Sequence, residues 1–296
     1  MRKNIFLLST LVIVGFVLSS CGTRECLPIE KYYDYDLQLP LKDTLTGIDT
    51  MDSYTMNHIT YTSIHGKKVN ALLSVPKGEK EPMPVIILLH GVGDRKTVDY
   101  IEFGHEFLLK KGYAVFRIDV ANHGDRKEDD YEVSFTDGYK YWTRDILSQT
   151  VFDLRRGIDL LSKRPEIDST RIGFYGISLG GFIGTVFTAV DKRVKVPVLT
   201  ITGGGLNIMF GMDALSGDVL DYLSVIDPIN YVDKISPRPL LMLNAENDDV
   251  VPPITSKHLY NKANKPKEII WYNSKHHDIP IEKVYQAGVD WYDKYL

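Results

Sequence analysis

Cysteine is scarce in this 296-residue sequence, which has only Cys21 and Cys26. Two cysteines are too few for a disulfide framework or a cysteine metal site in a chain of this length, and a single Cys21–Cys26 bridge is the alternative. The chain must therefore fold by burying its apolar residues, which make up 44% of the composition.

An excess of basic residues is also missing, because the formal net charge is −4. A surface that binds nucleic acid needs a positive excess, so we expect no nucleic-acid partner. The eight histidines show no H-E-x-x-H spacing, and no G-x-G-x-x-G follows an expected strand. We therefore expect neither a metal nor a nucleotide cofactor.

The first residues lack an apolar run long enough for a confident membrane span. Arg2 and Lys3 are followed by an almost wholly apolar segment, residues 5–18, which has the length of a signal-peptide core. The ending Leu18-Ser19-Ser20-Cys21 resembles the lipobox of bacterial lipoproteins. The resemblance implies that residues 1–20 are removed, that Cys21 is lipidated, and that the protein is anchored in the bacterial cell envelope, on the periplasmic side or at the cell surface. An ordinary secretory signal or an uncleaved anchor are the alternatives.

The remainder alternates between strand-like and helix-like segments. Residues 21–56 have a mixed pattern and are interpreted as a tether and N-terminal segment. Residues 57–296 begin with a hairpin, and residues 85–89 form a continuous apolar run typical of a strand buried on both faces. The alternation predicts one α/β domain with a mostly parallel sheet and helices on both faces. An insertion at about 206–236 interrupts it and is expected to overhang the pocket as a short cap.

A nucleophile motif lies between a predicted strand and a predicted helix. Gly176-Ile177-Ser178-Leu179-Gly180 has the G-x-S-x-G pattern of a nucleophile elbow, in which a strained turn exposes the serine. The glycines are expected where a Cβ atom would collide with a neighbouring strand or helix. The following helix N-terminus favours the negative charge that develops during acyl transfer. Ser178 is therefore the predicted nucleophile.

A serine hydroxyl needs a histidine base oriented by a carboxylate, and behind such an elbow the chain order is serine, acid, histidine. Asp248, with Asp249 and Glu246 as alternatives, follows a predicted strand in the right part of the chain. His276 and His277 follow the last predicted strand. Because adjacent residues point in different directions, only one of these histidines can reach the serine.

The four segments together resemble the serine α/β-hydrolase superfamily, in the branch that contains dienelactone hydrolases, acetyl xylan esterases and prolyl oligopeptidase catalytic domains. The resemblance covers residues 57–296, although dienelactone hydrolases proper carry cysteine at the nucleophile position. Its motifs stand in sequence order and are His90-Gly-x-Gly93, Gly176-x-Ser-x-Gly180, Asp248-x-x-Val-Pro252 and His277-x-Ile-Pro280.

The resemblance implies a role for each matching residue. Asp248 is the expected triad acid, and His277 is favoured over His276 as the base. The backbone N–H groups of Val92 and Leu179 are the expected oxyanion-hole donors. The expected activity is hydrolysis of carboxylic esters of small molecules or glycans through an acyl-enzyme. A serine peptidase or aminopeptidase of the same fold, and a catalytically silent surface-binding lipoprotein, are the alternatives.

Overall fold

The computed structural model describes residues 27–78, 82–128, 132–135, 138–211 and 221–296. The chain divides into a short unit, Met1–Tyr32, and a large unit, Tyr33–Leu296, which contains the sheet. A 3-10 helix, η1 (Ile29–Tyr33), crosses the boundary. Cys21, Cys26 and the expected signal peptide lie outside the described residues. No helix in the described part of the chain is long and apolar enough to cross a membrane.

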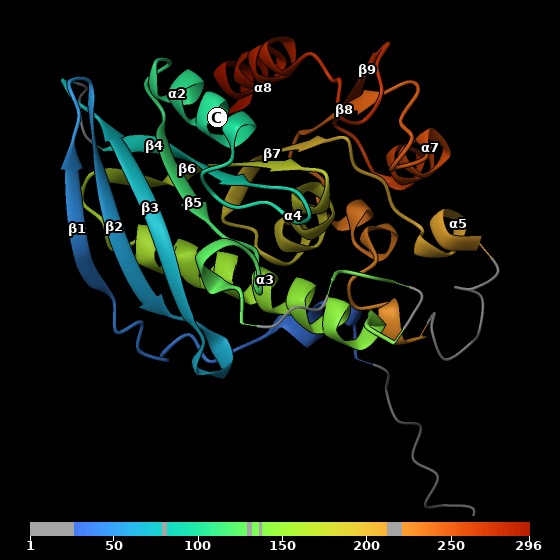
Figure 1. The fold of residues 1–296 in the computed structure, drawn as a ribbon, viewed down its shortest axis with the longest axis horizontal. Helices are drawn as coiled ribbons and strands as arrows, with labels where there is room; N and C mark the ends of the chain where they lie inside the picture. The colour runs from blue at the N-terminus through green and yellow to red at the C-terminus, as the bar shows by residue number, and fades with distance from the viewer. Residues whose placement is uncertain (1–26, 79–81, 129–131, 136–137, 212–220) are drawn as a thin grey trace, which may run out of the picture. The chain divides into compact units, whose positions relative to one another are not determined.

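In the described residues, nine strands form a single sheet in the order β1-β2-β3-β5-β4-β6-β7-β8-β9 (Figure 1). Strands β1, β2, β3 and β5 pair antiparallel, whereas β5, β4, β6, β7, β8 and β9 pair parallel. The prediction of a mostly parallel sheet is therefore confirmed. The strands are β1 (Thr44–Thr50), β2 (Tyr54–Thr62), β3 (Lys68–Pro76), β4 (Met83–Leu89), β5 (Ala114–Ile118), β6 (Ile167–Ile177), β7 (Val194–Thr200), β8 (Leu240–Ala245) and β9 (Lys267–Tyr272).

Helices cover both faces of this sheet, as the alternating pattern predicts. Helices α2 and α8 pack together on one face, and α3 and α4 pack together on the other (Figure 1). The α-helices are α2 (Asp99–Leu109), α3 (Lys140–Leu161), α4 (Leu179–Val190), α5 (Leu206–Phe210), α7 (Pro253–Lys262) and α8 (Ile281–Tyr295). In the part of the chain that the structure describes, four further 3-10 turns are η2 (Ile64–Gly66), η3 (Gly124–Arg126), η5 (Pro228–Asn230) and η6 (Val232–Lys234).

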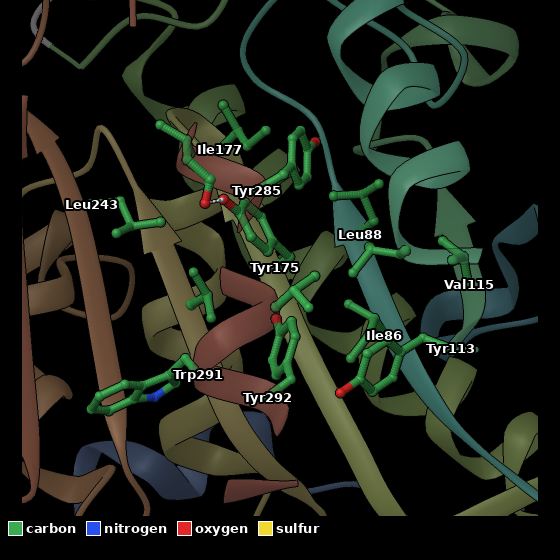
Figure 2. Close-up of a cluster of buried hydrophobic side chains, with 14 of the residues drawn as sticks. Ile86, Leu88, Tyr113, Val115, Tyr175, Ile177, Leu243, Tyr285, Trp291 and Tyr292 are labelled. Carbon is green, nitrogen blue, oxygen red and sulfur yellow. Dashed lines mark hydrogen bonds between the residues drawn. The ribbon is translucent and has the colours of Figure 1, made fainter. Parts of the chain in front are cut away.

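An aromatic cluster fixes α8 against the central strand β6 (Figure 2). The rings of Tyr175 and Tyr285 stack with their centroids 4.8 Å apart. The Tyr175 hydroxyl donates to the Val284 carbonyl at 3.0 Å, and the Tyr292 hydroxyl donates to the Phe174 carbonyl at 2.7 Å. Each buried phenol thus has a backbone acceptor, which avoids the cost of an unpaired polar group. The end of the β9–α8 loop that enters α8 is consequently fixed relative to β6.

The N-terminal segment requires a correction to the predicted domain boundary. Residues 44–50, expected within the tether, form strand β1, which pairs antiparallel with β2. The sheet therefore begins at Thr44 and not after residue 57. Strand β1 is an edge strand that is exposed on almost every residue. Because neither of its faces is buried, its sequence shows no alternation of apolar and polar residues from which the strand could be predicted.

The insertion after β7 is only partly described, since residues 212–220 lie outside the described ranges. Its described part contains α5, η5 and η6, of which η6 packs on α4 and η5 packs on α4 and α7. None of its described residues lines the pocket that contains Ser178. The expected cap over the pocket therefore stays a prediction that concerns residues 212–220.

Candidate active site

Ser178 occupies the sharp turn between β6 and α4. Its backbone has φ 54° and ψ −117°, a positive-φ conformation that costs a non-glycine residue roughly 1–3 kcal/mol. The Ser178 N–H donates to the Thr200 carbonyl at 2.9 Å, and the Ser178 carbonyl accepts from the Gly181 N–H at 2.8 Å. The neighbouring strand and the first helical turn thus hold the strained residue in place.

The two glycines of the motif are required by close backbone approaches. A Cβ atom at Gly176 would lie 2.4 Å from the Gly180 carbonyl oxygen. At Gly180, a Cβ atom would lie 2.5 Å from the carbonyl oxygen of Leu89, the last residue of β4. These separations are too short for any side chain, and they agree with the expected collision with helix and strand.

His276 joins Ser178 to Asp248 in one buried line of hydrogen bonds. The His276 Nε2 atom lies 3.0 Å from Ser178 Oγ, within reach for a proton transfer. Its Nδ1 atom lies 2.8 Å from Asp248 Oδ2 and 2.9 Å from Oδ1. With Nδ1–H donating to the carboxylate, Nε2 is left free to accept the serine proton.

The prediction that favoured His277 for this position is wrong. The His277 ring meets the His276 ring edge to face, at 5.1 Å, and its side chain is exposed at the rim of the pocket. The motif H-x-I-P marked the correct loop but the wrong member of the pair. The direction of each side chain depends on the turn after β9, where the Ser274 N–H donates to the Tyr272 carbonyl. Nothing in the residue pattern specifies that turn.

Asp248 is the acid that the structure brings to the histidine. Its Oδ1 atom accepts hydrogen bonds from the backbone N–H groups of Val250 at 2.9 Å and Val251 at 2.7 Å. These bonds fix the carboxylate and account for the tight D-x-x-V-P turn. The alternative Asp249 points outward, where its carboxylate lies 3.6 Å from Lys275 Nζ and both side chains are exposed. The other alternative, Glu246, is also exposed.

The expected oxyanion donors belong to Leu179, which follows the serine in the chain, and to Val92, which lines the same pocket. Leu179 is the first residue of α4, so its N–H has no acceptor within the helix. Val92 and Gly91 line the same pocket as Ser178, and a Cβ atom at Gly91 would lie 3.4 Å from the Ser178 Cβ. The placement fits an oxyanion hole, and the role of these donors stays a prediction.

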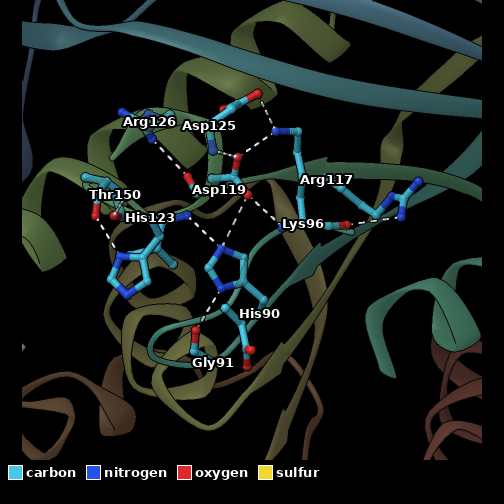
Figure 3. Close-up of polar contacts among 12 residues, drawn as sticks. His90, Gly91, Lys96, Arg117, Asp119, His123, Asp125, Arg126 and Thr150 are labelled. Carbon is cyan, nitrogen blue, oxygen red and sulfur yellow. Dashed lines mark hydrogen bonds and ion pairs between the residues drawn. The ribbon is translucent and has the colours of Figure 1, made fainter. Parts of the chain in front are cut away.

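The His90 side chain is hydrogen-bonded to the Gly91 backbone (Figure 3). The Val120 N–H donates to His90 Nε2 at 3.0 Å, so the ring proton is on Nδ1, which lies 2.7 Å from the Gly91 carbonyl oxygen. Burial lowers the pKa of His90 to about 4, which keeps the ring neutral. His90 is thus a hydrogen-bonding support for the loop and does not face the substrate pocket.

An ionic network lies next to His90, in which Lys96 and Asp119 are buried and Asp125 is exposed (Figure 3). Lys96 Nζ lies 2.5 Å from Asp119 Oδ2 and 2.8 Å from Asp125 Oδ2. Burial alone would raise the pKa of Asp119, but hydrogen bonds with Asp125 and Lys96 hold it below its usual value. Lys96 could not be identified from the sequence, because no local pattern distinguishes a buried lysine from an exposed one.

A pocket of about 390 Å³ opens over the catalytic line. Its walls are mainly apolar and are completed by the polar side chains of Asp94 and Tyr100, which sequence reasoning also missed. The apolar part comes from Ile177, Ile201, Val250, Ile279 and Ile281. In the described residues, no group of three or more His, Cys, Asp and Glu side chains could hold a metal ion. The site can perform acyl transfer with the chain's own side chains.

Comparisons with protein families and known relatives show which proteins this chain is similar to in sequence. The family model described as acetyl xylan esterase matches residues 28–201, and the model described as PhoPQ-activated pathogenicity-related protein matches residues 211–295. The putative hydrolase YtaP of Bacillus subtilis is 28% identical over 148 residues, which cover 45% of this chain and 48% of that protein. The uncharacterized peptidase YuxL of the same organism is 26% identical over 287 residues, covering 85% of this chain and 42% of that protein. The chain thus spans less than half the length of these two relatives.

A solved structure shows the same fold over nearly the whole chain. The acetyl xylan esterase from Paenibacillus sp. R4 superposes with a TM-score of 0.75 at 22% sequence identity, covering 93% of this chain and 96% of that one. This likeness confirms the α/β-hydrolase fold predicted from the four motifs. Because the acetyl xylan esterase model also matches more than half of the sequence, the protein belongs to the acetyl xylan esterase family of α/β-hydrolases.

Proposed function

We propose that the protein is a serine esterase that hydrolyses acetyl esters of small molecules or glycans. The observation that carries the proposal is the continuous line from Ser178 Oγ through His276 to Asp248, which opens into a mainly apolar pocket. Membership of the acetyl xylan esterase family supports the acetyl group as the acyl part.

The geometry suggests a two-step reaction. Ser178 Oγ attacks the ester carbonyl while His276 Nε2 takes its proton, and the N–H groups of Leu179 and Val92 stabilise the oxyanion. His276 then gives the proton to the departing alcohol, which leaves an acetyl-serine. A water molecule, deprotonated by His276, attacks this ester and releases acetate and the free serine. Asp248 holds the imidazole in the required tautomer throughout.

An acyl-chain series tests the acyl preference. With p-nitrophenyl acetate, butyrate and octanoate, kcat/KM is expected to be highest for the acetate. Acetylated xylan oligosaccharides, followed by acetate release, extend the test to glycans. A preference for the octanoate would contradict the acetyl assignment while leaving the serine chemistry intact.

Peptidase activity is the rival with a specific observation behind it, since one relative is named as a peptidase. Alanine p-nitroanilide releases p-nitroaniline from an aminoacyl amide linkage and therefore probes peptidase activity. We expect kcat/KM for the acetate ester to exceed that for the anilide by at least about a thousandfold. Faster cleavage of the anilide would make the protein a peptidase.

The cellular location is a separate proposal that rests on the sequence alone. The apolar residues 5–18 and the ending Leu18-Ser19-Ser20-Cys21 support a lipid anchor at Cys21 in a bacterial cell envelope. In a bacterial host, Cys21→Ser should abolish palmitate labelling and move the protein from the membrane to the soluble fraction. Cys26→Ser is the matched control and should remain labelled. An unlabelled wild-type protein would contradict the anchor.

A further inference from the structure

Tyr100 bridges the two ends of the loop that carries Val92. The Gly91 N–H donates to the Tyr100 hydroxyl oxygen at 2.8 Å. The same hydroxyl donates its own proton to Asp94 Oδ2 at 2.7 Å. One phenol thus connects the residue before Val92 with a residue beyond it, and its accepting lone pair is oriented by the bond to the carboxylate.

The loop needs such a restraint because glycines flank Val92. Gly91 and Gly93 lack the Cβ atoms that limit backbone rotation, and Gly93 has φ +77°. The planar peptide between Gly91 and Val92 contains both the Gly91 carbonyl and the Val92 N–H, so the two groups turn together. His90 fixes the carbonyl side of Gly91, and Tyr100 fixes its N–H side. With both sides held, the direction of the Val92 N–H is determined.

Tyr100 is itself held firmly by the fold. It lies in the first turn of α2, and its carbonyl accepts a hydrogen bond from the Tyr285 hydroxyl of α8 at 3.0 Å. Burial raises the pKa of Tyr100 well above its usual value, and the neighbouring Asp94 carboxylate adds to the rise. The hydroxyl therefore keeps its proton across the working pH range and can donate and accept at once.

We propose that Tyr100 is a positioning residue that aims the Val92 N–H at the oxyanion, acting through the Gly91 backbone. The inference rests on the proposed esterase function. A donor that is already aimed needs no reorganisation when the negative charge forms, so its benefit is largest in the transition state. Loss of the restraint should therefore reduce kcat and leave substrate binding nearly unchanged.

Tyr100→Phe tests this, because phenylalanine keeps the ring that lines the pocket and removes only the hydroxyl. With p-nitrophenyl acetate we expect kcat to fall by about 10- to 100-fold, below the roughly 100- to 1000-fold seen when an oxyanion donor is itself removed. KM should stay within about twofold. The inhibition constant of 1,1,1-trifluoroacetone, whose adduct on Ser178 places an oxyanion in the hole, should rise by the same factor as kcat falls.

The matched control is Tyr113→Phe. The Tyr113 hydroxyl also donates to a carboxylate, that of Asp293, at 2.7 Å, but Tyr113 does not line the pocket of Ser178. This variant should keep the wild-type kcat and inhibition constant. An unchanged kcat in Tyr100→Phe, or a lower kcat without weaker binding of the inhibitor, would overturn the inference.

A double-variant cycle gives an independent check. Asp94→Ala should lower kcat in the wild type, because the phenol loses the acceptor that orients it, and should have no further effect in Tyr100→Phe. Independent, additive losses would contradict a shared route through Tyr100. The proposed function is tested separately by the wild type: an inactive wild-type protein refutes the esterase, whereas an active wild type with an equally active Tyr100→Phe refutes only the positioning role.

Discussion

Replacing His276 with alanine is expected to lower kcat for p-nitrophenyl acetate by about 10⁴-fold or more. The imidazole is the group within hydrogen-bond distance of both Ser178 Oγ and the Asp248 carboxylate. Without it the hydroxyl keeps its proton during attack, and the leaving alcohol receives none. Because His276 is buried, thermal unfolding of the variant should be recorded to show that the fold survives the substitution.

His277→Ala is the matched comparison for that experiment. It removes the same side chain from the adjacent position, whose imidazole lies at the pocket rim. We expect KM to change, because the pocket wall is altered, while kcat falls by less than about tenfold. If His277→Ala were the more damaging substitution, the assignment of the base to His276 would be overturned.

Ser178→Ala is expected to cause the largest loss, about 10⁵- to 10⁶-fold in kcat. Without the hydroxyl no acyl-enzyme can form, and only the hydrolysis assisted by the pocket remains. The substitution keeps the backbone, and alanine fits where serine fits. Ser162→Ala is a suitable control, because the Ser162 hydroxyl donates to the Ile158 carbonyl at the end of α3 and does not line the pocket. It should retain full activity.

Much of the fold follows from local signals that a sequence displays. Residues 85–89 belong to β4, because a strand buried on both faces needs a continuous apolar run. Residues 179–190 form α4, which is buried along its length and consists mainly of apolar and small residues. Gly176 and Gly180 mark backbone contacts that exclude any side chain, so the elbow between them is also readable. Strand β1 was missed because an exposed edge strand requires neither apolar residues nor glycines at particular positions.

The site was predictable as far as chain order and motif spacing determine it. Ser178 and Asp248 each form hydrogen bonds with the backbone of the turn that their motif encodes. The motif therefore predicts the position of the side chain correctly. The choice between His276 and His277 depends on the direction of the turn that follows β9, which no residue pattern specifies. The hydroxyl of Tyr100 reaches Gly91 only because α2 packs beside the end of β4, a tertiary contact that no residue pattern reports.

The nucleophile pays a conformational cost that the surrounding packing must offset. Ser178 adopts a positive-φ conformation that a serine in an unrestrained turn avoids. Its N–H is bonded to β7, and the next helix is wholly buried through its first turns. The same rigid packing also fixes the nucleophile relative to His276, which lies in the loop between β9 and α8. Pre-organisation of this kind supports the esterase proposal.

Labelling with a fluorophosphonate probe, followed by mass mapping of the peptides, tests the central claim most directly. The probe phosphonylates a serine only when a neighbouring base activates it. The wild type should carry one adduct, on Ser178, whereas Ser178→Ala should carry none and His276→Ala should label at a greatly reduced rate. An adduct on another residue, or an unlabelled wild type that still hydrolyses p-nitrophenyl acetate, would contradict the triad of Ser178, His276 and Asp248.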